Sequence, residues 1–225
     1  MSKKEEVFQR WLQERDIEDV EAFVPDMAGT ARGKVVPADN FGSGQMKMPV
    51  AVFSQTISGG YIKDENNVED RDMWLVPDST TLRPVPWVTD PCASVFVDCY
   101  LRDGAPVAQS PRTVLRNVLA KFEARGWIPV VAPEVEFYLL KPQSDPHAES
   151  EPPQGRLGRT ETARQPFSID TMNDFDPFIV DLYNYCEVQG VRIETLSQEM
   201  GPAQFEINFM HGNALDLADQ VFLFK

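Results

Sequence analysis

Residues 204–209 carry the pattern of greatest chemical interest in this sequence, because polar and apolar side chains alternate along them without a break. Such alternation is typical of a β-strand with one buried face and one exposed face. The polar side of this strand presents Glu206 between two side-chain amides. A second carboxylate, Glu199, lies just upstream across a Gly-Pro turn signal, so the chain can double back and bring it towards Glu206. The segment therefore predicts two converging carboxylates.

Another pair of carboxylates, Glu134 and Glu136, stands at the start of a largely apolar run. Side chains two residues apart in a strand share a face, so this pair is expected on one side of a second strand. Four carboxylates on two short strands repel one another unless a cation lies between them. Oxygen ligands suit Mg²⁺ or Mn²⁺, which engage carboxylates together with substrate phosphates, so the pattern indicates a metal site that works with ATP. The same glutamates also fit ordinary exposed strand positions, and the pattern alone leaves that alternative open.

The composition of the chain excludes several classes of function. Its 225 residues are 42% hydrophobic, enough for a core, and a formal net charge of −14 argues against nucleic-acid binding. No apolar run reaches the roughly 20 residues of a membrane helix, and no signal peptide opens the sequence, so we expect a cytoplasmic protein with no membrane partner. Three cysteines at no metal-binding spacing predict reduced core thiols and argue against zinc. A Walker-type loop and a dinucleotide glycine pattern are both absent, so any nucleotide must be held in another way.

The expected elements describe an α+β protein with two domains. An amphipathic helix at residues 3–15 precedes several short strands. We place the domain boundary after residue 108, because Ser110-Pro111 is a strong helix start. Antiparallel strands with flanking helices follow, and the last expected helix is still open at Lys225. We therefore expect residues 109–225 to be an incomplete domain and the chain to be the first part of a longer protein.

Three connecting stretches carry further expectations. Residues 20–37 predict a hairpin, and residues 50–53 predict a strand that runs into a polar, glycine-ended loop. Residues 141–166 are rich in Pro, Gly, Ser and charged side chains, which predicts a long surface excursion. The hairpin turn is expected to display Asp26, Arg32 and Lys34.

Taken together, these segments resemble the glutamine synthetase family, and more closely its γ-glutamylpolyamine synthetase branch, which includes γ-glutamylputrescine synthetase. Residues 26–34 resemble the Asp-x-x-Gly-x-x-Arg-Gly-Lys hairpin of the family's N-terminal domain. Residues 133–140 resemble its Glu-x-Glu-Phe strand, and residues 199–208 its Glu-x-x-Pro-x-Gln-x-Glu-Ile-Asn segment. The last two motifs occur here in the family's order with a long insert between them.

The resemblance implies a fold, an activity and an assembly. Residues 1–108 would form a β-grasp-like domain, and residues 109–225 the first part of a catalytic domain. The activity implied is a ligase that uses ATP to form γ-glutamyl phosphate from glutamate and joins the γ-carboxylate to an amine, as in putrescine catabolism and nitrogen metabolism. Two or more Mg²⁺ or Mn²⁺ ions would act in each site. The family assembles as stacked rings, commonly dodecamers, with active sites between subunits, so a homo-oligomer is implied.

The family's motifs also imply roles for particular residues. Glu136, Glu199 and Glu206 would hold the metal nearer the glutamate substrate, and Glu134 would contribute to the metal at the ATP phosphates. Glu194 matches a position near the nucleotide. His211 is a candidate for the nucleotide side only because it directly follows the motif strand, and from the residues alone a structural or solvent role for it stays open. No residue of this chain is assigned a catalytic role.

One departure from the family's pattern bears on the amine. Glutamine-forming members carry Asp-Gly-Ser-Ser after the phenylalanine that matches Phe53, whereas here Ser54, Gln55 and Thr56 follow. The missing aspartate would help bind and deprotonate ammonium, so a larger amine such as putrescine is expected, with this loop at the amine site and the subunit interface. Glutamine synthetase using ammonium remains an alternative, as does a catalytically silent homologue that serves as a binding or regulatory subunit.

Overall fold

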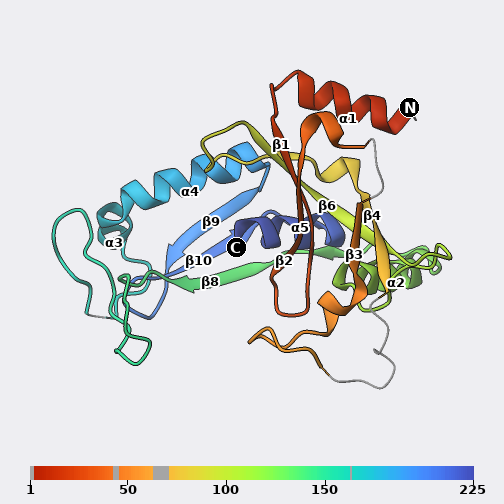
Figure 1. Ribbon diagram of the computed structural model, residues 1–225. Coiled ribbons are helices and arrows are strands. Elements are labelled where there is room, and N and C mark those ends of the chain that lie inside the picture. The colour runs from red at the N-terminus through yellow and green to blue at the C-terminus, as the bar shows by residue number, and fades with distance from the viewer. Residues whose placement is uncertain (1–2, 43–45, 63–70, 163) are drawn as a thin grey trace. The chain divides into compact units, whose positions relative to one another are not determined.

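The computed structural model describes residues 3–42, 46–62, 71–162 and 164–225, and its chain divides into two compact units (Figure 1). The first unit is Met1–Pro129 and the second is Val130–Lys225. Helix α2 (Pro111–Glu123) belongs to the first unit, so this division falls later in the chain than the boundary expected after residue 108. The domain boundary itself stays a prediction.

A mixed sheet forms the frame of the first unit. The strands follow the order β2-β1-β6-β4-β3, and β5 pairs with β6. β1 and β6 are parallel, while every other pair in this sheet is antiparallel, which is a β-grasp-like arrangement of two hairpins around parallel central strands. The bounds are β1 Asp19–Pro25, β2 Ala31–Pro37, β3 Met46–Pro49, β4 Asp72–Pro77, β5 Arg83–Pro84 and β6 Cys92–Tyr100.

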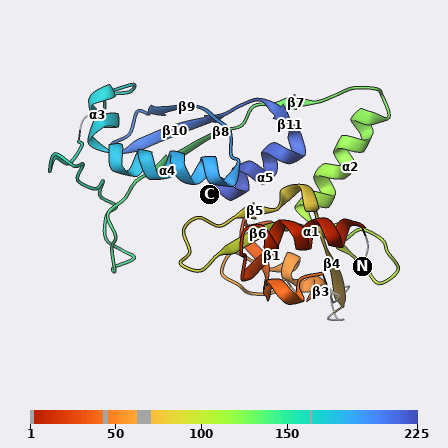
Figure 2. The same ribbon diagram turned by 90° about the horizontal axis from the view of Figure 1, so that it is seen from above.

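Helix α1 (Lys3–Gln13) packs on this sheet through its apolar side (Figure 2). Phe8 and Leu12, one helical turn apart, are buried, and the Phe8 ring meets the Phe41 ring edge-on at 5.5 Å between centroids. The strands supply the other side of the core, and Val20, from β1, is fully buried. The amphipathic helix, the strands around residues 20–24, 72–77 and 93–100, and the α+β class are confirmed.

The hairpin of β1 and β2 forms as expected, but the role expected of Asp26 is wrong. This side chain is buried, and its Oδ1 accepts hydrogen bonds from the backbone N–H groups of Ala28 and Thr30, both at 2.8 Å. Its Oδ2 accepts from Arg32 Nε at 2.7 Å. Burial alone raises the pKa of Asp26, yet the hydrogen bonds from Thr30, Arg32 and Ala28 outweigh it and hold that pKa below its ordinary value. Asp26 therefore closes the turn instead of being displayed, whereas Lys34 is exposed.

The strand expected at residues 50–53 is also wrong, because Val50–Ser54 forms the short 3-10 helix η2. Phe53 is buried from this helical turn, and the strand β3 ends just before it at Pro49. A short apolar run has no periodicity that separates a strand from a buried helical turn. The other two described 3-10 helices are η1 (Ala38–Asn40) and η4 (Ser79–Thr81).

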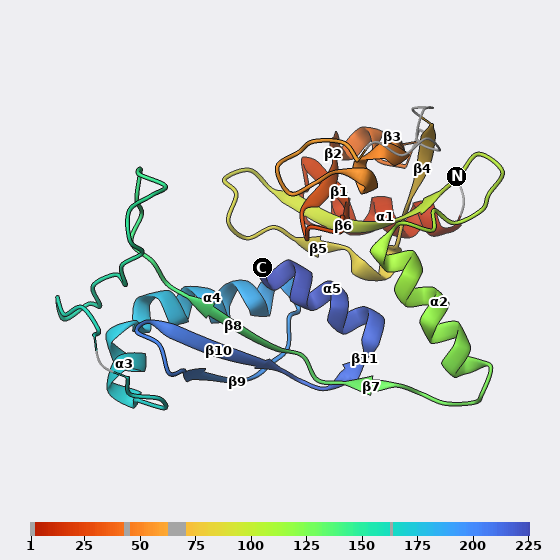
Figure 3. The ribbon, with the colours of Figure 1, turned by 90° about the horizontal axis from the view of Figure 1, so that it is seen from below.

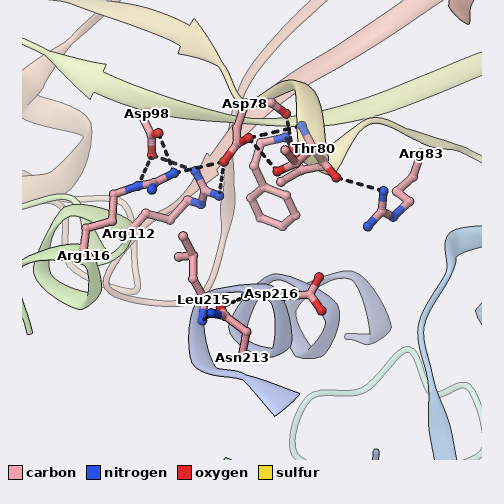
Figure 4. Close-up of polar contacts among 11 residues, drawn as sticks. Asp78, Thr80, Arg83, Asp98, Arg112, Arg116, Asn213, Leu215 and Asp216 are labelled. Atoms are coloured by element: carbon pink, nitrogen blue, oxygen red, sulfur yellow. Dashed lines mark hydrogen bonds and ion pairs between the residues drawn. The ribbon is translucent and has the colours of Figure 1, made fainter. Parts of the chain in front are cut away.

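Charged side chains attach the start of α2 to the first unit (Figure 4). Arg112, whose side chain is only 3% exposed, donates to Asp98 Oδ1 at 2.7 Å and to Asp78 Oδ2 at 3.1 Å, and its guanidinium lies 5.3 Å from the Phe96 ring centroid. Arg116, one turn later and 42% exposed, bonds the same two carboxylates at 2.8 and 2.9 Å. The four side chains form a network in which each carboxylate is shared by two arginines.

The second unit is built on the antiparallel sheet β8-β10-β9 (Figure 3). The apolar face of this sheet packs against α4 and α5, and β7 and β11 form a separate two-stranded antiparallel sheet. Pro133 separates β7 from β8, so the strand left open as continuous or broken is broken there. The bounds are β7 Val130–Val131, β8 Glu134–Tyr138, α3 Ile169–Asp174, α4 Asp176–Gln189, β9 Ile193–Gln198, β10 Gln204–Phe209, β11 Gly212–Asn213 and α5 Ala214–Phe224.

Local signals account for the ends of these helices. Gly190 ends α4 in the left-handed region at φ 68°, and the Asn213 side chain caps α5 by accepting from the N–H groups of Leu215 and Asp216. All three cysteines are free and buried, as expected. Among the described residues no helix combines the length and apolar character needed to cross a membrane.

The excursion at residues 141–166 follows the surface but is anchored to the second unit. Leu157 N–H donates to Asp174 Oδ1 at 2.8 Å, and Arg156 N–H donates to the Asp174 carbonyl at 2.8 Å. A Cβ at Gly155 would lie 2.2 Å from the Asp174 carboxylate carbon, so only glycine allows this approach. The excursion is thus held against the end of α3.

We predict that Arg112→Ala destabilises the first unit by about 3–5 kcal/mol, because it leaves two half-buried carboxylates with one partly exposed arginine, Arg116, as their cationic partner. Arg116→Ala is the matched control and is expected to cost at most about 1 kcal/mol, since this arginine is partly solvated. All four tryptophans lie within residues 1–129, so their fluorescence during urea unfolding reports on this unit. Equal losses in the two variants would contradict the assignment.

We also predict an acid-sensitive contribution from Asp78. Burial raises the pKa of this carboxyl, but hydrogen bonds from Thr80 and Arg112 outweigh it, so its pKa in the folded state lies below the ordinary value. The folded state then binds fewer protons than the unfolded state, and the contribution is present above about pH 4 and is lost as the pH falls through the folded pKa. The free energy of unfolding, measured by tryptophan fluorescence from about pH 2.5 to about pH 7, should fall less steeply on the acid side for Asp78→Asn than for wild type. The control Asp90→Asn, at an exposed position, should leave the acid dependence of the free energy of unfolding unchanged.

Candidate functional site

The polar face of the β8-β10-β9 sheet gathers the predicted carboxylates. The register of β8 and β10 places Glu136 directly opposite Glu206, and the register of β10 and β9 places Ser197 on the other side of Glu206. The alternating residues of β10 face away from this side, and Phe205, Ile207 and Phe209 are fully buried. Strand pairing therefore sets two glutamates side by side on one surface while the opposite face holds the core.

The third carboxylate arrives from the turn between β9 and β10. Glu199 N–H donates to the Gln204 carbonyl at 2.8 Å, which closes the turn directly after β9. One carboxylate oxygen each from Glu136, Glu199 and Glu206 lies within 4.8 Å of the others, and we call these three residues the glutamate cluster. Glu136 is exposed and the other two are half-buried, so the cluster is open to solvent ligands. The turn signal in the sequence correctly predicted that Glu199 approaches Glu206.

Gln204 links the turn to the cluster. Its Nε2 donates to Glu136 Oε2 at 2.8 Å, while its Oε1 accepts from Tyr138 Oη at 2.8 Å and from Gly201 N–H at 2.7 Å. With three partners and only 9% exposure, the amide has one favourable orientation. A Cβ at position 201 would lie 2.5 Å from Tyr138 Oη, so the turn requires Gly201 at this approach. Gln204 therefore orients Glu136 and the turn together.

Asn208 plays the corresponding part for Glu206. Its Nδ2 donates to Glu206 Oε1 at 2.9 Å, and its Oδ1 accepts a short hydrogen bond from Thr195 Oγ1. The amide therefore connects β9 to the cluster across the polar face of β10. Two amides that flank Glu206 in the sequence thus each hold one glutamate of the cluster by a side-chain donor.

The remaining predicted residues lie outside the glutamate cluster. Glu134 shares its face of β8, opposite Asn208 and exposed. Glu194 is the extra residue at a bulge, because Asn208 pairs with Thr195 while the next residue of β10 pairs with Ile193. Its side chain is exposed. His211 is exposed in the short connection between β10 and β11.

The predicted amine-site loop belongs to the first unit. Ser54 ends the helix η2, and Gln55 forms a β-bridge with Tyr61. Thr56 Oγ1 accepts from Gly60 N–H at 3.1 Å, and Ile57 at the tip is 94% exposed. The loop is therefore a small closed turn that presents an apolar tip.

The donor set of the cluster fits a hard divalent cation. Three carboxylate oxygens this close repel one another, and a cation between them removes that repulsion. Carboxylates without thiolate or imidazole partners suit Mg²⁺ and Mn²⁺ better than zinc or copper. The open side of the cluster leaves room for waters or phosphate oxygens, which Mg²⁺ usually retains as ligands.

Sequence reasoning missed one carboxylate that bears on this site. Glu161, from the excursion, accepts hydrogen bonds from Gln198 Nε2, from Ala203 N–H at 2.6 Å and from Thr171 Oγ1 at 3.2 Å. The signal in the sequence is weak, since Glu161 stands among arginines and threonines in a stretch with no periodicity. Only the fold brings it to the β9–β10 turn.

Comparison with known proteins decides the family. The family described as "Glutamine synthetase, catalytic domain" matches residues 108–225, more than half of the chain. The chain belongs to the glutamine synthetase family. The family match includes the whole glutamate cluster, and it begins next to the expected domain boundary.

Individual members of the glutamine synthetase family agree with this assignment. The chain is 29% identical over 214 residues to "Gamma-glutamylputrescine synthetase PuuA" of Escherichia coli K12, covering 92% of the chain and 45% of that protein. It is 31% identical over 229 residues to "Glutamine synthetase" of Methanosarcina mazei, covering 99% and 47%. The chain spans about half the length of these curated relatives.

A solved structure described as a "novel glutamine synthase homolog" has the same fold. It superposes with a TM-score of 0.76 at 20% identity, covering 92% of this chain and 47% of the other. This likeness supports the α+β fold expected for the glutamine synthetase family, including the β-grasp-like sheet of the first unit.

Proposed function

We propose that this glutamine synthetase family protein takes part in ATP-dependent ligation of the γ-carboxylate of glutamate to an amine, through a γ-glutamyl phosphate intermediate. The observation that carries the proposal is the glutamate cluster, three carboxylates brought within 4.8 Å in a chain of this family. Strand register and a tight turn place them there, and a like-charged cluster of this kind is unfavourable without a cation. This chain spans about half the length of the curated relative, so the activity is proposed for the whole protein.

In this proposal Glu136, Glu199 and Glu206 hold one Mg²⁺ or Mn²⁺ ion, and Glu134 contributes to a second. Such ions neutralise phosphate charge as a phosphoryl group moves from ATP to an acceptor carboxylate. Glu194 and His211 contribute on the nucleotide side. Hydrogen bonds from Gln204 and Asn208 orient two of the ligands, Glu136 and Glu206, before a metal binds.

For the amine we propose a polyamine such as putrescine. The curated relatives include both a γ-glutamylputrescine synthetase and a glutamine synthetase at similar identity, so overall similarity does not select one of them. The loop at Ser54, Gln55 and Thr56 supports the larger amine, because it offers no carboxylate for ammonium. We further propose that the protein acts in the cytoplasm, in keeping with its free buried thiols, and that it assembles as a homo-oligomer in stacked rings.

We predict that the chain binds Mn²⁺ and that Glu206→Gln weakens this binding at least about tenfold, since one charged ligand of three is neutralised. Glu187→Gln is the matched control, because Glu187 is exposed on α4, away from the polar face of the sheet. The electron paramagnetic resonance signal of free Mn²⁺ gives the affinity directly. Equal affinity in wild type and Glu206→Gln would remove the metal assignment.

We predict that phosphate release from ATP by the whole protein, with glutamate and Mg²⁺ present, is stimulated more by putrescine or spermidine than by ammonium or ethanolamine. The measurement compares kcat/KM for each amine. A preference for ammonium would refute the polyamine assignment and favour the glutamine synthetase alternative. Normal Mn²⁺ binding without release in any amine would favour the binding or regulatory subunit.

A further inference from the structure

Glu161 reaches from the excursion to both ends of the turn that carries Glu199. Its carboxylate accepts from the Gln198 side chain, directly before Glu199, and from the backbone N–H of Ala203, at the end of the same turn. Both partners are fully buried, with 0% exposure. Hydrogen bonds to a charged acceptor are about twice as strong as those between neutral groups. One side chain therefore holds the turn on either side of a cluster residue.

The backbone at Ala203 needs such support. Ala203 has φ 52°, in the left-handed region that residues with a Cβ rarely adopt. Conformations of this kind persist where the surrounding structure holds them, and they are common at functional sites. The N–H of Ala203 donates to Glu161 Oε2 at 2.6 Å, so the carboxylate forms its backbone hydrogen bond with the strained residue itself.

Glu161 is itself held in place. Thr171 Oγ1, from α3, donates to it at 3.2 Å, and the Ser168 side chain caps the same helix. The preceding turn of the excursion is fixed on Asp174 by the N–H of Leu157. These contacts therefore fix the position of the Glu161 carboxylate.

The turn is held from two directions. Gln204 binds Gly201 N–H on the polar face of the sheet, next to Glu136. Glu161 binds the turn at Gln198, whose neighbour in register is the buried Phe205 of the apolar face. The first contact connects the turn to the glutamate cluster, and the second connects it to α3 and the excursion.

We propose that Glu161 is a positioning residue, which holds the β9–β10 turn so that the Glu199 carboxylate stays against Glu136 and Glu206. It acts through the turn and is not a member of the glutamate cluster. The inference rests on the proposed metal-binding function for its consequence, a higher metal affinity, but its structural content is independent of any metal.

The test uses Glu161→Gln in the 225-residue chain. The isosteric amide places an N–H₂ donor where the carboxylate accepts from three donors, so at least one contact is lost. Without metal, hydrogen exchange at Ala203 N–H, followed by NMR, should become about tenfold faster, as for a lost charged hydrogen bond. The Mn²⁺ dissociation constant, from the free-ion signal, should rise about tenfold.

Three further variants separate positioning from general stability. Glu149→Gln makes the same chemical change at an exposed site of the excursion and should alter neither readout. Val221→Ala loosens the core of the same unit and should leave the Mn²⁺ affinity unchanged. Glu161→Asp keeps two acceptor oxygens and should recover part of both effects; it also provides the readouts if Glu161→Gln does not fold.

The outcomes are distinct. Unchanged exchange at Ala203 in Glu161→Gln overturns the inference, and so does faster exchange with an unchanged Mn²⁺ affinity. An equal loss of affinity in Val221→Ala also overturns it, because the effect would then come from general destabilisation. If wild type and Glu206→Gln both fail to bind Mn²⁺, the proposed function fails, whereas the exchange of Ala203 still decides whether Glu161 holds the turn.

Discussion

The second unit depends on a conflict between like charges and strand pairing. The register that buries Phe205 and Ile207 also places Glu136 opposite Glu206, and like charges directly opposite in a sheet are destabilising. The register cannot slip by one residue to relieve this, because every apolar side chain of β10 would then move to the solvent side. Burial of the apolar side chains therefore keeps the carboxylates of Glu136 and Glu206 together, although electrostatic repulsion alone would separate them.

The arrangement explains why amides and not further charges surround the cluster. An amide donates to one carboxylate without adding to the negative field, and its second group remains free to bond the backbone or another strand. Gln204 and Asn208 use both of their polar groups in this way. Ligands that are oriented in advance lose less conformational freedom when a cation binds. The hydrogen bonds from these amides, together with the fold, therefore pre-organise the carboxylates.

Local patterns predicted those parts of the fold that depend on neighbours along the chain. Alternation identified β10, and Ser110-Pro111 identified the start of α2. The patterns failed where the position of a side chain depends on packing that no periodicity along the chain indicates. Asp26 looked like a displayed turn residue but is buried against Arg32, and the apolar run at 50–53 became a helical turn. Arg112 gave no sign of being buried, because its partners lie 14 and 34 residues away.

For the site, the sequence by itself determined which carboxylates share a face and that Glu199 doubles back, since strand periodicity and a Gly-Pro turn are local properties. The motifs also identified the family. The family's motifs had already set Glu134 apart from the other three metal candidates. Only the tertiary structure shows that one carboxylate oxygen from each of those three lies within 4.8 Å of the others, because strand register and the turn bring them together. The same holds for Glu161, whose contacts lie up to 42 residues away along the chain. Such contacts form only when the core has packed, and no pattern of neighbours encodes them.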